Sequence, residues 1–191
     1  MASGSKLRGT TWVLGGYSVI TDVIKSTIMK KWDGTTFGDL TTGLGAALYA
    51  KYAIVHLGRM WLFNVTSGTA TPHMVLASAY ENPQSYDTTQ RAVSGTFATG
   101  NEAFYMLTPD LRPINGAALF YGELVISTEG GRLWKLSGTS TATFSWTSYY
   151  AGSAAIGTET LSNIGDDLVY MKKDGVIESV RSTADFGDVK T

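Results

Sequence analysis

The acidic residues that could perform acid–base chemistry stand in or beside turns predicted from the sequence. The candidates are Glu123, Glu129, Asp166 and Asp174. Hydrolysis of a glycosidic bond needs two carboxyl groups that flank the bond, about 5–10 Å apart. Acidic side chains in turns commonly accept hydrogen bonds from the backbone of the turn itself. We therefore interpret all four carboxylates as turn residues and predict no catalytic pair among them.

Nucleophilic and metal chemistry would have to use His56 or His73, because these are the only imidazoles in the chain. No Gly-x-Ser-x-Gly elbow accompanies them, and they lack the spacing of a helical zinc-ligand pair. The chain has no cysteine, which excludes disulfides and thiolate metal sites. Asp185-Phe-Gly187 matches the kinase magnesium motif, but no catalytic loop or glycine-rich phosphate loop supports it. We predict no catalytic, cofactor-binding or metal-binding residue, and hence no enzyme.

Residues 127–134 nearly match the Asp-box of sialidase-type propellers, Ser-x-Asp-x-Gly-x-x-Trp, with Glu129 in the place of the aspartate. In that box the carboxylate caps turn amides and the Trp packs between strands, so the resemblance implies a hairpin and not hydrolysis. A sialidase-like glycoside hydrolase would also need clustered arginines. The arginines that could take part are scattered along the chain: Arg59, Arg91, Arg112 and Arg132. This enzyme is the weakest alternative function.

Aromatic side chains could instead form a sugar-binding platform. The residues that would build it are Tyr149, Tyr150 and Trp146, with Tyr80 or Tyr86. Tyr and Trp are more often core or interface residues. A receptor- or glycan-binding β-propeller module therefore remains the second hypothesis.

Composition favours strands and tight turns over helices. The chain has 22 glycines, 4 prolines and 16% charged residues, together with many Thr, Ser, Tyr and Val residues, which suit a pleated, half-buried surface. Its formal net charge is −1, whereas tight nucleic-acid binding usually needs a concentrated basic face. We expect an all-β protein that contacts DNA weakly if at all. We expect neither a signal peptide nor a membrane-spanning segment, because no apolar stretch is long enough.

Short apolar strands separated by turns recur along the chain. Residues 10–17 and 18–24 are predicted to be strands joined at Gly15-Gly16, and Asp33-Gly34 is a strong turn dipeptide. Residues 44–56 are ambiguous: they are predicted to begin as a short helical turn or an extended lead-in, followed by a strand over residues 52–57. A last hairpin is predicted around Asp174-Gly175.

Three similar runs, each with a turn between apolar strands, are centred near residues 58, 122 and 165, at intervals of about 64 and 43 residues. Propeller blades repeat at about 40–50 residues, so the longer interval predicts one blade with an inserted loop near residues 81–115. Residues 26–180 then supply about three to three and a half blades. We predict a β-propeller-like array of antiparallel four-stranded blades, incomplete, with about three to four blades. It would form a single domain over residues 9–191, after a flexible arm of residues 1–8.

The order of these segments resembles the tail nozzle and head-stabilisation proteins of short-tailed bacteriophages, over residues 26–188. The segments that carry the resemblance are Lys31-Trp-Asp-Gly34, the Gly-Arg-Met-Trp turn in residues 57–63, the Ser-acidic-Pro loop of residues 78–87, the hairpin of residues 120–138, the glycine-rich residues 152–157 and the Lys-Asp-Gly hairpin with Phe-Gly-Asp in residues 174–188.

The resemblance implies a structural virion protein, a module of the tail nozzle or neck that surrounds the DNA channel and contributes to genome retention and ejection. Its implied partners are other copies of itself around a symmetry axis and other tail or neck proteins, such as portal, adaptor or tail tube proteins. Its implied location is the virion, after assembly in the host cytoplasm. Open sheet edges, which invite pairing with another chain, agree with these partners.

Overall fold

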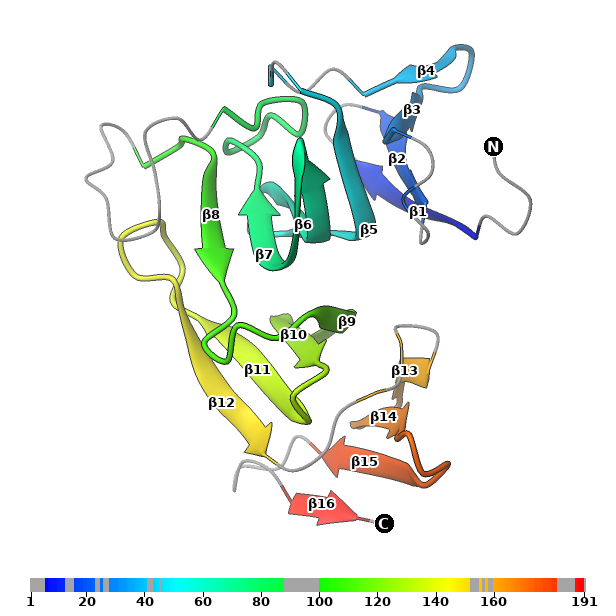
Figure 1. Cartoon of the computed structure of the whole chain (residues 1–191), viewed down its shortest axis with the longest axis vertical. Helices are drawn as coiled ribbons and strands as arrows, with labels where there is room; N and C mark the ends of the chain where they lie inside the picture. The colour runs from blue at the N-terminus through cyan, green and yellow to red at the C-terminus, as the bar shows by residue number, and fades with distance from the viewer. Residues whose placement is uncertain are drawn as a thin grey trace. The chain divides into compact units, whose positions relative to one another are not determined.

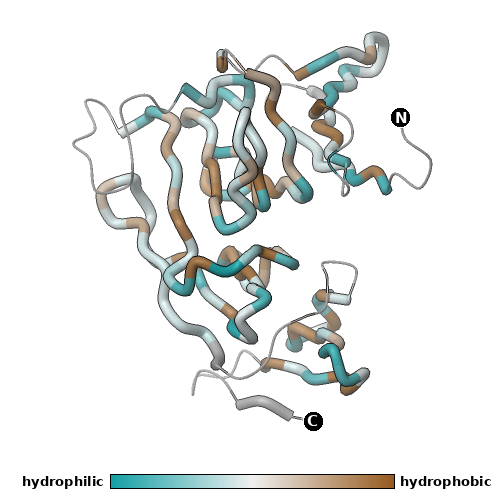
Figure 2. Tube along the Cα trace, viewed as in Figure 1, coloured by the Kyte–Doolittle hydropathy of each residue, from teal (hydrophilic) through white to brown (hydrophobic). Residues whose placement is uncertain are grey.

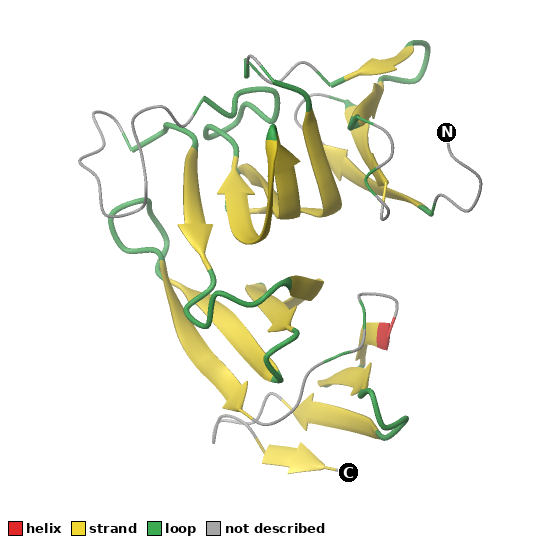
Figure 3. Ribbon diagram, in the orientation of Figure 1, coloured by secondary structure: helices red, strands yellow, loops and turns green. Residues whose placement is uncertain are grey.

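The chain is built from antiparallel β-sheets. The computed structural model describes residues 6–12, 16–22, 25, 28–40, 43–44, 46–87, 100–151, 155, 157, 160–181 and 188–190. Within them, sixteen strands form four sheets of four strands each (Figure 1), with no α-helix and only a short helical turn at Thr160 (Figure 3). In every sheet the strands follow one another in chain order, which is the meander of a propeller blade. The prediction of an all-β, propeller-like array of four-stranded blades is confirmed.

Each sheet takes one continuous stretch of sequence. The first contains β1 (Leu7–Trp12), β2 (Tyr17–Asp22), β3 (Lys30–Trp32) and β4 (Phe37–Asp39), and the second contains β5 (Leu48–His56), β6 (Arg59–Ser67), β7 (Thr69–Ala77) and β8 (Phe104–Leu107). The third contains β9 (Ile114–Phe120), β10 (Glu123–Thr128), β11 (Arg132–Ser137) and β12 (Ser145–Ala151), and the fourth contains β13 (Leu161–Ile164), β14 (Asp167–Met171), β15 (Ile177–Arg181) and β16 (Asp188–Lys190).

The three similar runs are the first hairpins of the second, third and fourth sheets. Leu57-Gly58 joins β5 to β6, Tyr121-Gly122 joins β9 to β10, and Gly165-Asp166 joins β13 to β14. In the first two turns both central residues have positive φ, between 47° and 75°. Such turns match the right-handed twist of paired strands. The repeat therefore marks the same position in successive blades.

The first sheet lies mostly ahead of the region from which the sequence counted blades. β1 begins at Leu7, inside the predicted arm, because Leu7 and Arg8 pair with Asp22 and Thr21 of β2. The predicted turn at Asp33-Gly34 is present. A carboxylate oxygen of Asp33 accepts hydrogen bonds from the amides of Thr35 (3.0 Å) and Thr36 (2.7 Å), which lower the pKa of Asp33.

The predicted insertion near residues 81–115 is not entirely loop. It contains β8, whose Leu107 and Phe104 pair with Met74 and Ala77 of β7, and the start of β9 at Ile114. Residues 88–99 of this segment, like Gly15, lie outside the described residues. The strand predicted over residues 52–57 is present, and β5 extends it back to Leu48, through residues for which a helical turn was an alternative, because their backbone pairs with β6.

The contacts of the chain divide it into two compact units. The first comprises residues 1–107 and 139–143, and the second comprises residues 108–138 and 144–191. Apolar and polar residues are interspersed along the strands (Figure 2), and buried apolar residues form a core within each unit. The first core contains Trp12, Val19, Met29, Leu40, Leu48, Ala50, Met60, Leu62, Val65, Leu76 and Tyr86. The second contains Phe120, Val125, Leu133, Ala155, Leu161, Leu168, Tyr170 and Val180.

Candidate functional site

The four candidate carboxylates each have a local structural role or face solvent. Glu123 pairs with Lys135 at 3.1 Å, and Asp166 accepts a hydrogen bond from the hydroxyl of Tyr121. Asp174 accepts one from the amide of Val176 at 3.0 Å, and the side chain of Glu129 is exposed in a turn. In the described parts of the chain, no group of three or more His, Asp or Glu residues gathers in a way that could hold a metal ion.

The Asp-box-like segment forms the β10–β11 hairpin, but Glu129 does not act as its capping carboxylate. The carboxylate that contacts this hairpin is that of Asp110, which bonds a side chain of β10 and not a turn amide. Its carboxylate accepts hydrogen bonds from the Thr128 hydroxyl (2.6 Å) and from the Arg112 amide (3.3 Å). An added Cβ at Gly130 would lie 2.7 Å from an Asp110 oxygen, so glycine is needed there. The sequence pattern missed Asp110 because the residue reaches the hairpin through space, from the preceding loop.

Both histidines belong to strands of the second sheet. The ring centroid of His56, at the end of β5, lies 6.3 Å from that of Trp61, and the carbonyl oxygen of His56 accepts a hydrogen bond from the Trp61 indole at 2.9 Å. His73 is half-buried in β7. These contacts are those of packing residues.

Arg59 is the most constrained charged residue in the described chain. Its guanidinium, on a residue that is only 3% exposed, donates hydrogen bonds to the carbonyl oxygens of Ser78 (2.6 Å), Gly100 (2.7 Å) and Glu102 (2.7 Å). Burial lowers the pKa of Arg59 to about 10. The residue therefore ties the start of β6 to the two ends of the segment between β7 and β8. Sequence reasoning considered Arg59 only as a member of an arginine cluster.

The other arginines do not join Arg59 in a described cluster. Arg112 lies in the loop before β9, and Arg132 lies in β11 with its guanidinium carbon 5.6 Å from the centre of the Trp134 ring. Both belong to the second unit, whereas Arg59 belongs to the first. Arg91 and Asp185-Phe-Gly187 lie outside the described residues.

The aromatic residues of the proposed sugar platform are not all on the surface and do not all belong to the same unit. Tyr86 is fully buried in the first core, and Tyr80 is 46% exposed in the same unit. Trp146 and Tyr149 are half-buried in β12 of the second unit, and the side chain of Tyr150 is outside the described part. Burial of Tyr149, and next the charge of Glu123, raise the pKa of the Tyr149 hydroxyl.

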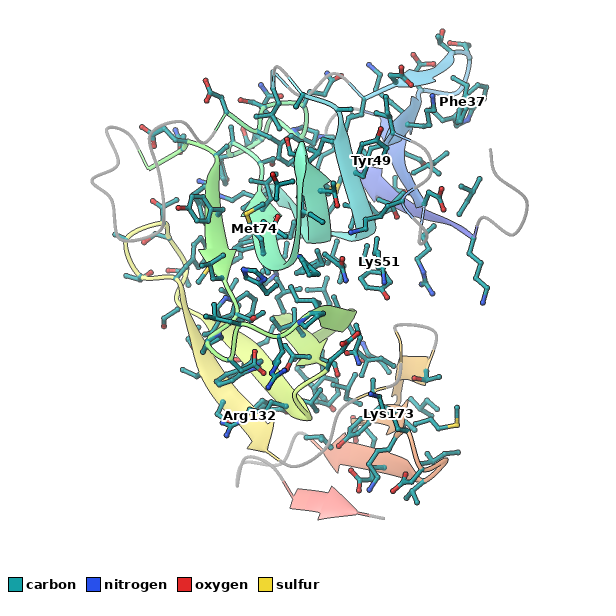
Figure 4. All side chains as sticks on the ribbon, in the orientation of Figure 1. Phe37, Tyr49, Lys51, Met74, Arg132 and Lys173 are labelled. Carbon is teal, nitrogen blue, oxygen red and sulfur yellow. The ribbon has the colours of Figure 1, made fainter. Side chains whose placement is uncertain are left out.

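Exposed apolar side chains lie on the side of the first sheet that does not carry the core, which also holds the ion pair of Lys30 and Asp39. Strand alternation places Leu7, Ile20, Trp32 and Phe37 on the face opposite Val19. Leu7, Trp32 and Phe37 are 40–49% exposed, and Trp32 and Phe37 are cross-strand partners. Phe37 projects from the β3–β4 hairpin (Figure 4). We call these four residues the outer face of the first sheet.

The fourth sheet has a comparable surface. Ile164 and Ile177 are each 62% exposed, on the face opposite the buried Leu168 and Val180. Half-buried Met171 is the strand partner of Ile177, whereas Ile164 pairs with Asp167 at the other end of β14. We call Ile164, Met171 and Ile177 the outer face of the fourth sheet. Each outer face, within its own unit, can bury apolar area against a partner, and each is a separate candidate interaction site.

Comparison with models of known protein families finds none that matches this chain, and comparison with curated proteins finds no relative. Among the described residues there is no helix with the length and hydropathy needed to cross a membrane.

Proposed function

We propose that this chain is a structural module of a tailed-bacteriophage virion, in the tail nozzle or neck around the DNA channel, where it contributes to genome retention and ejection. The observation that carries the proposal is an array of blade-like sheets whose first and last members each leave an apolar face exposed. The order of the turn motifs along these sheets, which resembles that of the nozzle proteins, supplies the identity of the assembly.

The exposed faces support assembly because a monomer gains nothing from them. Burial of apolar surface is worth about 25 cal/mol per Å², and contiguous exposed apolar patches commonly mark interaction sites. The proposed partners are further copies of this chain around a symmetry axis and neighbouring tail or neck proteins, such as portal, adaptor or tail tube proteins. The strands β4 and β16, each at the edge of its sheet, offer further pairing positions.

The charge of the chain suits a wall that DNA slides past. A formal net charge of −1 provides little general attraction for phosphate. The carboxylates considered for catalysis serve turns and ion pairs, and a non-enzymatic role agrees with these contacts.

The proposal is tested by locating the chain in particles produced from the genome that encodes it. Antibody-gold labelling and electron microscopy are expected to place the chain at the neck or tail, after assembly in the host cytoplasm. Particles without the chain, or label distributed over the capsid, would contradict the proposal.

The role of the outer face is tested with the double variant Trp32→Ser/Phe37→Ser. We expect particles to incorporate it at least tenfold less than the wild-type chain, because the apolar partner contact is lost. The matched control is Leu111→Asn, which changes a residue 59% exposed in the loop before β9 and should be incorporated normally. Equal incorporation of all three chains would show that this face has no role in assembly.

A further inference from the structure

Basic side chains gather where the first two sheets meet. The Thr21 hydroxyl of β2 donates a hydrogen bond to the backbone carbonyl of Lys51 in β5 at 3.1 Å. Ala50 pairs with Val65 and Tyr52 pairs with Phe63, so Lys51 of β5 lies opposite Asn64 of β6. The register between β6 and β7 shifts at the same place, between Phe63 and Val65. The ammonium group of Lys25, which follows β2, donates a hydrogen bond to the Asn64 side-chain oxygen at 3.1 Å. Lys25 and Lys51 therefore lie at the same irregularity of the second sheet (Figure 4 labels Lys51).

The two ammonium groups are not neutralised by a described carboxylate. Lys25 donates to Asn64 and to the hydroxyl of Thr66 (3.0 Å), which are both neutral acceptors. Lys30, Lys135 and Lys172, by contrast, each pair with a described carboxylate. The nearby Asp22, which is 2% exposed, pairs with Leu7 in the strand register and, together with Thr21, lines a depression on the first sheet.

Local features show that this arrangement is costly. Lys25 and Asn64 both have a left-handed backbone, with φ of 55°, which residues that carry a Cβ rarely adopt. Burial, followed by the charge of Lys51, lowers the pKa of Lys25. A third cation, Arg8 of β1, lies with its guanidinium carbon 5.6 Å from the centre of the ring of Tyr52, the residue after Lys51. An anion between the lysines would relieve their repulsion.

We propose that Lys25, Lys51 and the hydroxyl of Thr66 bind a phosphate group, either free phosphate or a phosphodiester of a nucleic-acid backbone. The Thr66 hydroxyl accepts a hydrogen bond from Lys25, so its own proton is available to an oxyanion. Ammonium groups are effective partners for phosphate as point charges. The site goes beyond the proposed function and does not depend on it, since a phosphate can bind whether or not the chain assembles into a virion.

The test uses the full chain and two variants of equal charge. Lys25→Gln/Lys51→Gln removes two positive charges from the site. Lys6→Gln/Lys173→Gln removes two from exposed positions elsewhere and is the matched control. The single variant Lys51→Gln keeps the hydrogen bonds of Lys25 and serves if the double variant folds poorly. Binding of inorganic phosphate is measured by calorimetry and by the rise of the melting temperature.

We expect wild-type and control chains to bind phosphate with equal affinity, and both site variants to bind at least tenfold more weakly. In phosphate-free buffer, Lys51→Gln should melt no lower than the wild type, because the repulsion with Lys25 is gone. Phosphate binding that is equal in all chains, or absent from the wild type, would overturn the proposal.

A second measurement identifies the source of the phosphate. The anisotropy of a fluorescent 20-base-pair DNA duplex is followed at increasing salt concentrations. DNA affinity falls as the salt concentration rises. If the site binds a phosphodiester, the plot of log affinity against log salt should be less steep for the double variant than for the control, by about one to two units of slope. Phosphate binding without DNA binding assigns the site to free phosphate, and both results support an anion site. If the wild-type chain bound neither inorganic phosphate nor the DNA duplex, the proposal would be overturned.

Discussion

At the residue scale, Arg59 shows how one side chain can replace missing secondary structure. The carbonyl groups of Ser78, Gly100 and Glu102 lie outside the strands, and the Arg59 guanidinium is their hydrogen-bond donor. A planar guanidinium with five donors suits this task better than any other side chain. The centre of the Phe104 ring lies 5.2 Å from the Arg59 guanidinium carbon and adds a favourable cation–π contact.

Replacing Arg59 should therefore cost more than replacing an exposed arginine. We expect Arg59→Met to destabilise the first unit by about 3 kcal/mol, because three buried carbonyl groups lose their donor. Arg59→Lys should destabilise the unit by less than Arg59→Met but still measurably, since an ammonium group cannot reproduce the planar fork of the guanidinium. Arg132→Met, whose residue is exposed in the second unit, should cost under about 1 kcal/mol. Urea unfolding followed by tryptophan fluorescence measures these differences, and equal costs for Arg59→Met and Arg132→Met would refute this role.

Glu178 forms a second polar cluster, on the buried side of the fourth sheet. The residue is 5% exposed, and its carboxylate accepts a hydrogen bond from the Tyr170 hydroxyl at 2.9 Å and pairs with Lys172 at 2.7 Å. The hydrogen bond with Glu178 is the main reason that the pKa of Lys172 is raised above 10.5. Stability gained in this way is present below pH 10.5 and is lost as the pH rises through the higher folded-state value.

The pH dependence of Glu178→Gln tests this linkage. The glutamine can still accept a hydrogen bond from Tyr170, but it lacks the charge that holds Lys172. The wild type should be more stable than the variant at about pH 9, and the difference should shrink as the pH rises beyond the raised pKa of Lys172. Lys173→Gln, at an exposed neighbouring position, is the control and should show no such convergence. A constant difference between wild type and Glu178→Gln across this range would disprove the linkage.

Sequence reasoning found the residues whose roles are local and missed those that act through space. Asp33 and Asp174 were predictable because an acidic residue before a glycine caps its own turn. Asp110 and Arg59 were not, because each serves a segment that is brought close only by the fold. The outer faces were missed as well. The apolar residues around Trp32 or Ile177 in the sequence do not show whether these side chains are exposed or buried, because that depends on which face of the sheet is covered.

At the element scale, the first hairpin of each blade depends on its turn. Leu57-Gly58 and Tyr121-Gly122 occupy equivalent positions and have similar backbones, but their surroundings differ. An added Cβ at Gly58 would lie 2.4 Å from the Tyr80 ring, whereas one at Gly122 would meet nothing within 4 Å. The two glycines therefore separate the cost of backbone conformation from the cost of side-chain packing.

The variants Gly58→Ala and Gly122→Ala should differ in stability by about the value of the Tyr80 contact. Gly122→Ala should cost about 1 kcal/mol, the penalty of a left-handed backbone. Gly58→Ala should cost about 2 kcal/mol, because the methyl group also displaces Tyr80 from its position 6.0 Å from the Arg59 guanidinium carbon. In a Tyr80→Ala background the excess cost should disappear. If it persists in that background, a double-mutant cycle would show no coupling and the proposed cause would be wrong.

Strong turn dipeptides made the hairpins predictable, and the run that reaches Trp32 before Asp33-Gly34, which contains β3, was expected to be a strand. β4 could not be predicted, because its three residues are too few to display a period of two. It is a strand because β3 offers a paired edge, a property of the sheet rather than of its own sequence. The number of blades counted from residue 26 onward therefore did not include the first sheet as a complete blade.

At the scale of the whole molecule, each unit combines a well-packed sheet with a weakly covered one. In the first unit, β6 is buried along residues 59–65 and paired on both sides, whereas β4 is paired on one side and carries the exposed Phe37. In the second, β10 is buried from Leu124 to Thr128, and β13 is an edge strand with one buried residue. Opening of a strand costs free energy in proportion to the contacts that it must release.

Native-state hydrogen exchange should reveal this gradient and connect it to assembly. Amides of residues 61–65 in β6 should exchange about a thousandfold more slowly than that of Phe37 in β4, because they exchange only when the unit unfolds globally. In the assembled form, a partner on the outer face of the first sheet should slow exchange in β3 and β4 and leave β6 unchanged. Leu111→Asn should show the same protection as the wild type, whereas Trp32→Ser/Phe37→Ser should lose the protection added by assembly. Uniform protection of β4 and β6 in the monomer would mean that the outer face is already covered, and would contradict its role as a docking surface.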